Sequence, residues 1–306
     1  MKMNKKIIVS TLALAMGAAL AGSVSGTVAW FQYATRAQVS YIGTSGHCSE
    51  LLQISVDDGS TWKNEFETSD LTGNNVTADG SDIVPITSGG VAKDANVSSF
   101  YSNPIYQISG ASYADTWNEA LTSNYLQFTI KFRVADVNEN GKTDYLDKDI
   151  YLLDLTLQDA DGSGDLSEAL RVHFHTSAGV NFLIAKTATS TATSGNLDLN
   201  GDNSPDLAEG YEWDTGRSAI TYGSGTQTSY AVDELLASDD GTGNLSGGES
   251  LGNTGGGASF SITVTIWLEG WHQYNSSAIW DSEDYVGKGF QVGMRFAVPL
   301  HDNANE

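Results

Sequence analysis

The segment Tyr125-Leu-Gln-Phe-Thr-Ile-Lys-Phe-Arg-Val134 alternates strictly between apolar and polar residues. Its apolar members are Leu126, Phe128, Ile130, Phe132 and Val134. Successive side chains of a β-strand point to opposite faces, so this pattern predicts a strand with one face in a core and the other in solvent. Strands of this kind are typical of antiparallel sheets.

The same alternation recurs in two segments near the C-terminus. The apolar positions there are Phe260, Ile262, Val264, Ile266 and Leu268, and then Phe290, Val292, Met294, Phe296 and Val298. Further predicted strands span 38–42, 51–56, 150–157, 171–175 and 181–185, and short helices are predicted at 167–170 and 231–237. The polar stretches 187–195 and 237–259 are predicted to be surface loops. The sequence therefore predicts an all-β fold, an antiparallel β-sandwich with long polar loops, formed by a single domain over 30–306.

The N-terminal segment has the layout of a secretory signal peptide. Lys2, Lys5 and Lys6 precede an uncharged, weakly apolar run over residues 7–25 that ends in small residues. This pattern predicts a removable leader and a secreted or cell-surface protein. A retained membrane anchor is the competing interpretation, because the run is long enough to span a bilayer marginally.

Charge and cysteine content narrow the class of protein further. The 38 acidic and 15 basic residues give a formal charge of −23, which opposes binding to nucleic acid and to anionic lipid. Cys48 is the only cysteine, so the chain has no internal disulfide. We interpret Cys48 as a small, partly buried residue, with an intermolecular disulfide as the alternative.

The first of two acidic loops runs from Asp136 to Asp147 and has the spacing of an EF-hand calcium loop. Oxygen-bearing side chains fall at positions 1, 3, 5, 9 and 12, Gly141 stands at the sixth position, and the seventh needs to offer only a backbone carbonyl. The predicted ligands are Asp136, Asn138, Asn140, Lys142 through its carbonyl, Asp144 and Asp147.

The second loop, from Asp198 to Glu209, repeats this spacing with Asn203 at the turn. Its predicted ligands are Asp198, Asn200, Asp202, Ser204, Asp206 and Glu209. Convincing helices flank neither loop, so we expect structural Ca²⁺ sites that cross-link loops, not helix-opening sensors. A third acidic segment, 159–165, has Leu170 at the twelfth position and is interpreted as a turn or a weak site.

Catalytic motifs are missing from the sequence. It contains no zinc-protease, nucleophile-elbow, phosphate-loop or dinucleotide motif, and we predict that the chain is not an enzyme. His173 and His175 would share one strand face and could grip one ion, although two polar-face histidines are the simpler interpretation. Trp267, Trp271, Tyr274 and Trp280 could stack on sugars, but we interpret them as core and subunit-contact residues.

The junction Gly26-Thr-Val-Ala-Trp-Phe31 resembles the signal region that SipW-type signal peptidases process. Substrates of these peptidases include the TasA and camelysin family of biofilm-matrix proteins. The C-terminal segments 262–268 and 290–298 are also similar to the close of that family's sandwich. The resemblance implies cleavage after Ala29, which would make residues 1–29 the signal peptide, and a jelly-roll-like fold.

The family resemblance further implies a subunit of an extracellular filament, in which each copy donates an N-terminal strand to the next. The donor would lie at about 30–42; an ordinary first strand that pairs within its own domain is the alternative. The expected partners are copies of the same chain and a signal peptidase. A calcium-dependent adhesin or carbohydrate-binding protein is the second hypothesis, and a camelysin-like metallopeptidase is the third.

Overall fold

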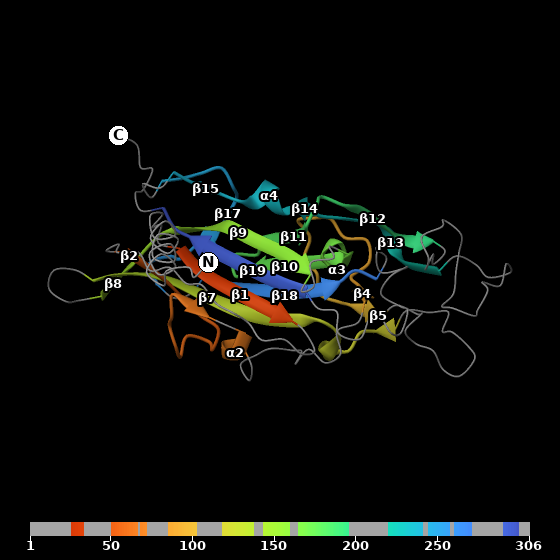
Figure 1. Ribbon diagram of the computed structural model, residues 1–306, viewed down its shortest axis with the longest axis horizontal. Helices are drawn as coiled ribbons and strands as arrows, with labels where there is room; N and C mark the ends of the chain where they lie inside the picture. The colour runs from red at the N-terminus through yellow and green to blue at the C-terminus, as the bar shows by residue number, and fades with distance from the viewer. Residues whose placement is uncertain are drawn as a thin grey trace, which may run out of the picture.

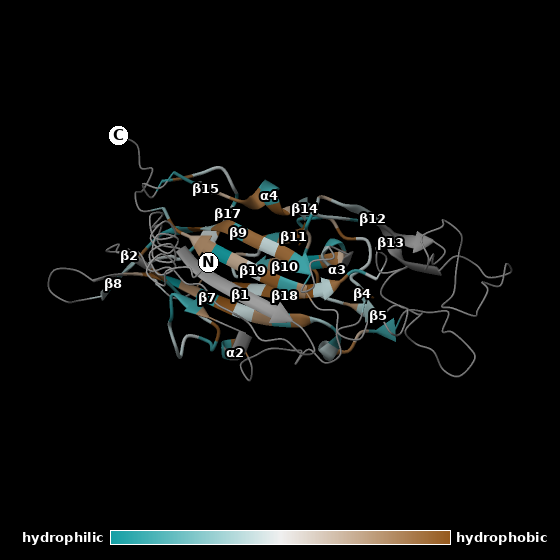
Figure 2. Ribbon diagram, viewed as in Figure 1, coloured by the Kyte–Doolittle hydropathy of each residue, from teal (hydrophilic) through white to brown (hydrophobic). Residues whose placement is uncertain are grey.

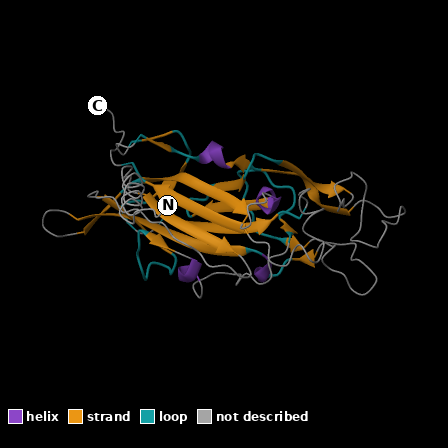
Figure 3. Cartoon of the chain, viewed as in Figure 1, coloured by secondary structure: helices purple, strands orange, loops and turns teal. Residues whose placement is uncertain are grey.

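A computed structural model describes residues 26–33, 50–66, 68–71, 85–102, 118–137, 143–159, 165–195, 220–240, 244–257, 260–270 and 290–299. Strands dominate these residues, and the helices are short and lie beside the strands (Figure 3). The prediction of an all-β protein is confirmed. Within the described ranges, no helix has both the length and the apolar character that crossing a membrane requires.

The long strands are β1 (Gly26–Tyr33), β2 (Glu50–Ser55), β7 (Leu126–Val137), β9 (Asp149–Asp159), β10 (Leu170–Thr176), β11 (Asn181–Ala185), β12 (Ser190–Gly195), β13 (Ile220–Thr228), β18 (Ser261–Leu268) and β19 (Phe290–Ala297). The shorter strands are β3 (Glu65–Phe66), β4 (Ile86–Thr87), β5 (Tyr101–Ser102), β6 (Asn118–Glu119), β8 (Thr143–Leu146), β14 (Tyr230–Ala231), β15 (Ser238–Asp239), β16 (Leu245–Ser246) and β17 (Ser250–Asn253). The helices are α2 (Thr68–Leu71), η2 (Thr122–Asn124), α3 (Asp165–Ala169) and α4 (Val232–Leu235).

Strand β7, which contains the alternating segment 125–134, lies inside a seven-stranded sheet. The strand order is β14-β11-β10-β18-β7-β2, and β8 pairs with β7 as a hairpin arm. All five alternating apolar residues of β7 are at most 3% exposed, whereas Gln127, Thr129, Lys131 and Arg133 are half-buried on the other face. The alternation therefore predicted both the strand and its buried face correctly. Figure 2 shows hydrophobic (brown) and hydrophilic (teal) residues following one another along the strands.

A second sheet has five strands in the order β17-β9-β19-β1-β3. Its central strand, β19, pairs antiparallel with β9 on one side and with β1 on the other (Figure 1). The two-residue strand β3 adds to the far side of β1 in parallel. Of the predicted strands, 38–42 lies outside the described residues.

The two sheets share one hydrophobic core. The ring of Phe132 on β7 meets that of Phe296 on β19 edge to face, with centroids 5.0 Å apart, and Phe174 on β10 lies 6.4 Å from the same ring. Such aromatic pairs add to the stabilisation from burial itself. Core residues come from β2, β7, β9, β10, β18 and β19 together.

A smaller apolar layer covers the opposite face of β10, β11 and β18. It consists of Ile86, Val97, Phe100, Leu183 and Trp267. The segment 85–102 holds this layer in place through backbone hydrogen bonds, among them Leu183 N to Lys93 O at 2.7 Å and Gly270 N to Ile86 O at 2.8 Å. Both faces of β10 are consequently buried over most of its length.

The prediction of surface loops over 187–195 and 237–259 was wrong in part. Residues 190–195 form β12, which pairs with β13, and β17 forms an edge of the five-stranded sheet. Leu251 anchors β17 because its side chain is fully buried in the main core. These strands were not predicted because their sequences are polar and lack the apolar alternation that indicates a half-buried strand.

Candidate functional site

The most distinctive element near the predicted processing point is β1. All eight of its residues pair with β19, from Gly26 opposite Ala297 to Tyr33 opposite Phe290. Val28 and Ala29 also pair with Glu65 and Phe66 of β3. The described part of the predicted donor segment, 30–33, therefore pairs within a sheet of its own chain, while residues 34–42 lie outside the described residues.

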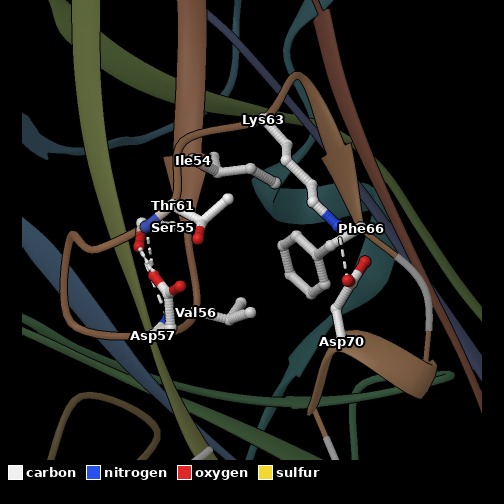
Figure 4. A pocket seen from close by; sticks show the side chains of 8 residues that line it. All are labelled: Ile54, Ser55, Val56, Asp57, Thr61, Lys63, Phe66 and Asp70. Carbon is white, nitrogen blue, oxygen red and sulfur yellow. Dashed lines mark hydrogen bonds and ion pairs between the residues drawn. The ribbon is translucent and has the colours of Figure 1, made fainter.

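A pocket of about 220 Å³ opens beside β1, between β2, the turn that follows it, β3 and α2 (Figure 4). Phe66, the partner of Ala29, forms part of its wall. Ile54, Val56 and Phe66 belong to the main core and make the apolar part of the lining. Ser55, Asp57, Thr61, Lys63 and Asp70 complete it.

The charged groups of the pocket are held in fixed partnerships. Lys63 forms an ion pair with Asp70 on one side, and Asp57 stands on the other (Figure 4). The Asp57 carboxylate accepts hydrogen bonds from Ser55 Oγ at 2.7 Å and from Thr61 N at 2.8 Å. These bonds lower the pKa of Asp57 to about 2, so it stays ionised near neutral pH. The pocket suits the binding of a small apolar group within a charged rim.

The described residues of the first acidic loop, 136–137 and 143–147, belong to the β7–β8 hairpin and the residue that follows it. Asp136 and Asp144 are backbone partners across it, which brings positions 1 and 9 of the loop together. Asp147 is exposed and follows the end of β8, three residues beyond Asp144, so it is about 10 Å away along an extended chain. Asn138, Asn140 and Lys142 lie outside the described residues.

The second acidic loop, with Asp198, Asn200, Asp202, Ser204, Asp206 and Glu209, lies wholly outside the described residues. In the part of the chain that the structure describes, no three His, Cys, Asp or Glu side chains cluster as a metal site would require. The Asp159 carboxylate of the third acidic segment is buried and accepts bonds from Ser167 N at 2.8 Å and Ser167 Oγ at 3.2 Å. Asp159 thus joins the end of β9 to α3, while residues 160–164 of this segment lie outside the described residues.

An aromatic and cationic cluster lies on the polar face of β2 and β7. The Arg133 guanidinium is 4.2 Å from the Trp62 ring centroid and 5.5 Å from that of Tyr145, and Arg133 Nε donates to Gln53 Oε1 at 2.7 Å. Tyr145 is 43% exposed. A guanidinium close to two aromatic rings can offer both charge and apolar surface to planar or sugar-like ligands. The periodicity of β7 placed Arg133 on this face, but no sequence signal predicted Trp62 as its partner.

His173 and His175 do share one face of β10, but they do not form an accessible pair. Their rings lie 6.5 Å apart and nearly parallel. His173 is 1% exposed and its Nε2 has no hydrogen-bond partner, whereas His175 Nδ1 is 2.7 Å from Asn181 Oδ1. Burial lowers the pKa of His173 to about 4, so its imidazole is neutral at neutral pH.

A buried polar network, which sequence reasoning missed, continues along the same face of β10. The Arg171 side chain is fully buried, and its Nε donates to Gln227 Oε1 at 3.1 Å. Gln227 Nε2 donates in turn to Glu269 Oε2 at 2.8 Å, and Trp267 Nε1 donates to the same carboxylate oxygen at 3.2 Å. Sequence periodicity indicated only part of this network, because it places Arg171, His173 and His175 on one face of a predicted strand.

Trp267 is fully buried against Phe100, which confirms its interpretation as a core residue. Trp271, Tyr274, Trp280 and Cys48 lie outside the described residues. In comparisons with known proteins, no family model, no curated protein and no solved structure matches this chain.

Proposed function

We propose that the chain is a structural subunit of an extracellular or cell-surface filament, assembled by exchange of N-terminal strands and stabilised by Ca²⁺. The proposal includes a jelly-roll-like β-sandwich, secretion with removal of residues 1–29, and copies of the same chain as partners. The observation that carries it is the position of β1, which fills the space between β19 and β3.

Strand exchange is favoured because β19 has an open backbone edge when β1 is absent. Removal of β1 would leave a row of unpaired backbone donors and acceptors along a strand whose apolar side chains are buried. Such an edge binds another strand readily, and every processed copy carries the N-terminal segment that begins at Trp30. Head-to-tail contacts between identical subunits produce open filaments when the rotation from one copy to the next does not close a ring.

Electron microscopy of the chain that starts at Trp30, with Ca²⁺ and with chelator, tests both parts of the proposal. We expect filaments that need Ca²⁺. Deletion of residues 30–42 should give a folded, soluble monomer, as checked by circular dichroism and sedimentation. Filaments from the deleted chain would contradict strand exchange, and filaments that ignore chelator would contradict the role of Ca²⁺.

The cluster of Arg133, Trp62 and Tyr145 favours a second candidate, a Ca²⁺-dependent adhesin that binds carbohydrate. It lies at the base of the β7–β8 hairpin, which carries the first acidic loop. A glycan-binding screen of the chain and of Tyr145→Ala, Trp271→Ala and Trp280→Ala tests it. Binding lost in Tyr145→Ala alone would place the ligand on this cluster. The metallopeptidase remains the third hypothesis, and proteolysis that is sensitive to chelator would support it, although the burial of His173 argues against a metal site at that residue.

A further inference from the structure

We propose that Arg133, Trp62 and Tyr145 form a binding site for an acidic sugar, in which the Arg133 guanidinium pairs with a single carboxylate of the ligand. This inference rests on the second candidate function, the carbohydrate-binding adhesin, because it names the class of ligand for the same cluster. It depends neither on filament assembly nor on cleavage of the N-terminal segment. All three residues lie within the described part of the chain.

Arg133 lies near two aromatic rings that come from opposite sides of β7. Strands β2 and β8 both pair with residues 134–136 of β7, so they lie along its two opposite edges. Trp62 follows β2 in the chain, and Tyr145 belongs to β8. The three strands meet at the end of the molecule on the left of Figure 1. The rings therefore flank the guanidinium, with centroids 4.2 Å and 5.5 Å from its carbon.

The Arg133 guanidinium has only neutral partners among the described residues. Its Nε donates to Gln53 Oε1 at 2.7 Å, and one terminal nitrogen donates to Tyr145 Oη at 3.4 Å. By contrast, Lys131 on the same face of β7 forms an ion pair with Asp58 at 2.6 Å. Within the described ranges, no carboxylate contacts Arg133, although it is half-buried and part of it meets solvent. A guanidinium oriented in this way can bind a carboxylate through paired N–H groups.

The turn that carries Trp62 is fixed by hydrogen bonds of its own. The Asp57 carboxylate accepts from Ser55 Oγ at 2.7 Å and from Thr61 N at 2.8 Å. Gly59 has a φ of +89°, a conformation that glycine adopts without strain. The indole ring consequently stands in a defined place beside the guanidinium, and binding a ligand there requires little further ordering of the protein.

Charge determines which ligand the cluster favours. The formal charge of −23 repels polyanions, whereas a ligand with one carboxylate avoids most of this repulsion and still gains the contact with Arg133. The rings of Trp62 and Tyr145 offer apolar surface to the C–H groups of a sugar. Lys131 lies two residues away on the same face, about 7 Å along the strand, and its pair with Asp58 offers donors and acceptors to hydroxyl groups. A sugar with one carboxylate, such as a uronic acid, fits all of these groups.

The test measures the affinity of the full chain for three probes by calorimetric titration and by saturation-transfer NMR. Methyl glucuronide carries the ring and the carboxylate, methyl glucoside has the ring without the carboxylate, and acetate has the carboxylate without the ring. We expect methyl glucuronide to bind about tenfold more tightly than either of the others. Equal affinity for the glucuronide and the glucoside would overturn recognition of the carboxylate. Equal affinity for the glucuronide and acetate would overturn recognition of a sugar.

Three variants locate the site. Arg133→Gln should remove the preference for glucuronide over glucoside, and Tyr145→Ala should weaken the binding of both sugars. Arg295→Gln is the matched control, because Arg295 is an exposed arginine on β19 in the other sheet. Tyr145 is 43% exposed, so its variant tests the site even if Arg133→Gln fails to fold. A preference that survives Arg133→Gln, full affinity in Tyr145→Ala, or an equal loss in Arg295→Gln would contradict binding at this cluster.

Failure of this inference can be told apart from failure of the adhesin function. If a glycan screen finds ligands but the glucuronide binds no better than the glucoside, carbohydrate binding stands and recognition of an acidic sugar is overturned. If the screen finds no ligand and neither sugar binds, both are overturned. Filament assembly is measured separately, by electron microscopy, and neither result bears on it.

Discussion

His173 places a neutral imidazole in an apolar layer, where its pKa of about 4 reflects the cost of burying a charge. In an unfolded chain the pKa is near its ordinary value of about 6.5. The folded pKa is the lower of the two, so the unfolded state binds the proton more readily in acid. The resulting stability is fully present above about pH 6.5 and is lost as the pH falls towards 4.

We expect acidification from pH 7 to 4 to cost about 3 kcal/mol of unfolding free energy through His173 alone. Urea unfolding at a series of pH values measures this, and His173→Gln should flatten the loss between pH 6.5 and 4. His175→Gln is the control, because it leaves the buried imidazole of His173 in place. An unchanged acid slope in His173→Gln would show that other groups carry the effect.

Gln227 connects a buried guanidinium to a buried carboxylate, so its removal should be costly. Gln227→Leu would leave Arg171 Nε and Glu269 Oε2 without the bonds they now share with it. We expect a loss of about 2–4 kcal/mol in unfolding free energy by urea titration. Gln158→Leu, at an exposed position of β9, should stay within about 0.5 kcal/mol. Similar costs for the two variants would contradict a role for the network.

At the scale of elements, the β7–β8 hairpin places two acidic residues opposite each other. Asp136 and Asp144 are direct partners, and like charges at such positions destabilise a hairpin by up to about 1 kcal/mol. A bound cation would reverse this effect. Asp144→Asn should therefore stabilise the protein in chelator but reduce the rise in Tm that Ca²⁺ produces.

Calorimetry with and without Ca²⁺ measures both effects, the higher Tm in chelator and the smaller rise in Tm with Ca²⁺. Asp233→Asn on α4 is the control, because Asp233 is an exposed acidic residue. If Asp144→Asn and Asp233→Asn respond alike to Ca²⁺, the first loop does not bind it through Asp144. The second loop would then have to carry any stabilisation that remains.

Elements with apolar alternation were predictable, and those without it were not. The five apolar residues of β7 predict the strand and its buried face, because period-two burial leaves a direct trace in the sequence, but β7 extends past Val134 to Val137. The pairing of β12 with β13 leaves no such trace, since β12 consists of Ser, Thr, Ala and Gly residues without an apolar alternation. The hydrogen bond between Arg171 and Gln227 joins residues 56 positions apart, so local periodicity cannot predict it.

The candidate site was predictable to a similar, limited degree. The spacing of the first acidic loop predicts that Asp136 and Asp144 are ligands of one ion, and these two residues lie opposite each other across the hairpin. The burial of His173 could not be predicted, because the segment 85–102 that covers its face of the sheet is irregular. The junction motif located the N-terminal segment but did not indicate that a strand would run across it.

At the scale of the whole molecule, a formal charge of −23 opposes close contact between copies. Salt shortens the range of this repulsion, from about 30 Å at ~0.01 M to about 8 Å at ~0.15 M. We expect added NaCl over this range to raise Tm and to speed assembly of the Trp30 chain, as measured by calorimetry and light scattering. Sucrose at matched osmolality is the control, and assembly that slows with salt would show that attractive charge pairs dominate the contact.

Under the proposed function, the strand that crosses the predicted junction would also affect the order of cleavage and folding during export. A chain that folds before it is cut hides its own cleavage site within a sheet, because both neighbours of Val28 and Ala29 are then in place. Cleavage and folding would thus compete, and the faster of the two would determine whether a molecule is processed. The amount of active peptidase would then set the fraction of newly exported chains that are cut before they fold and can enter filaments.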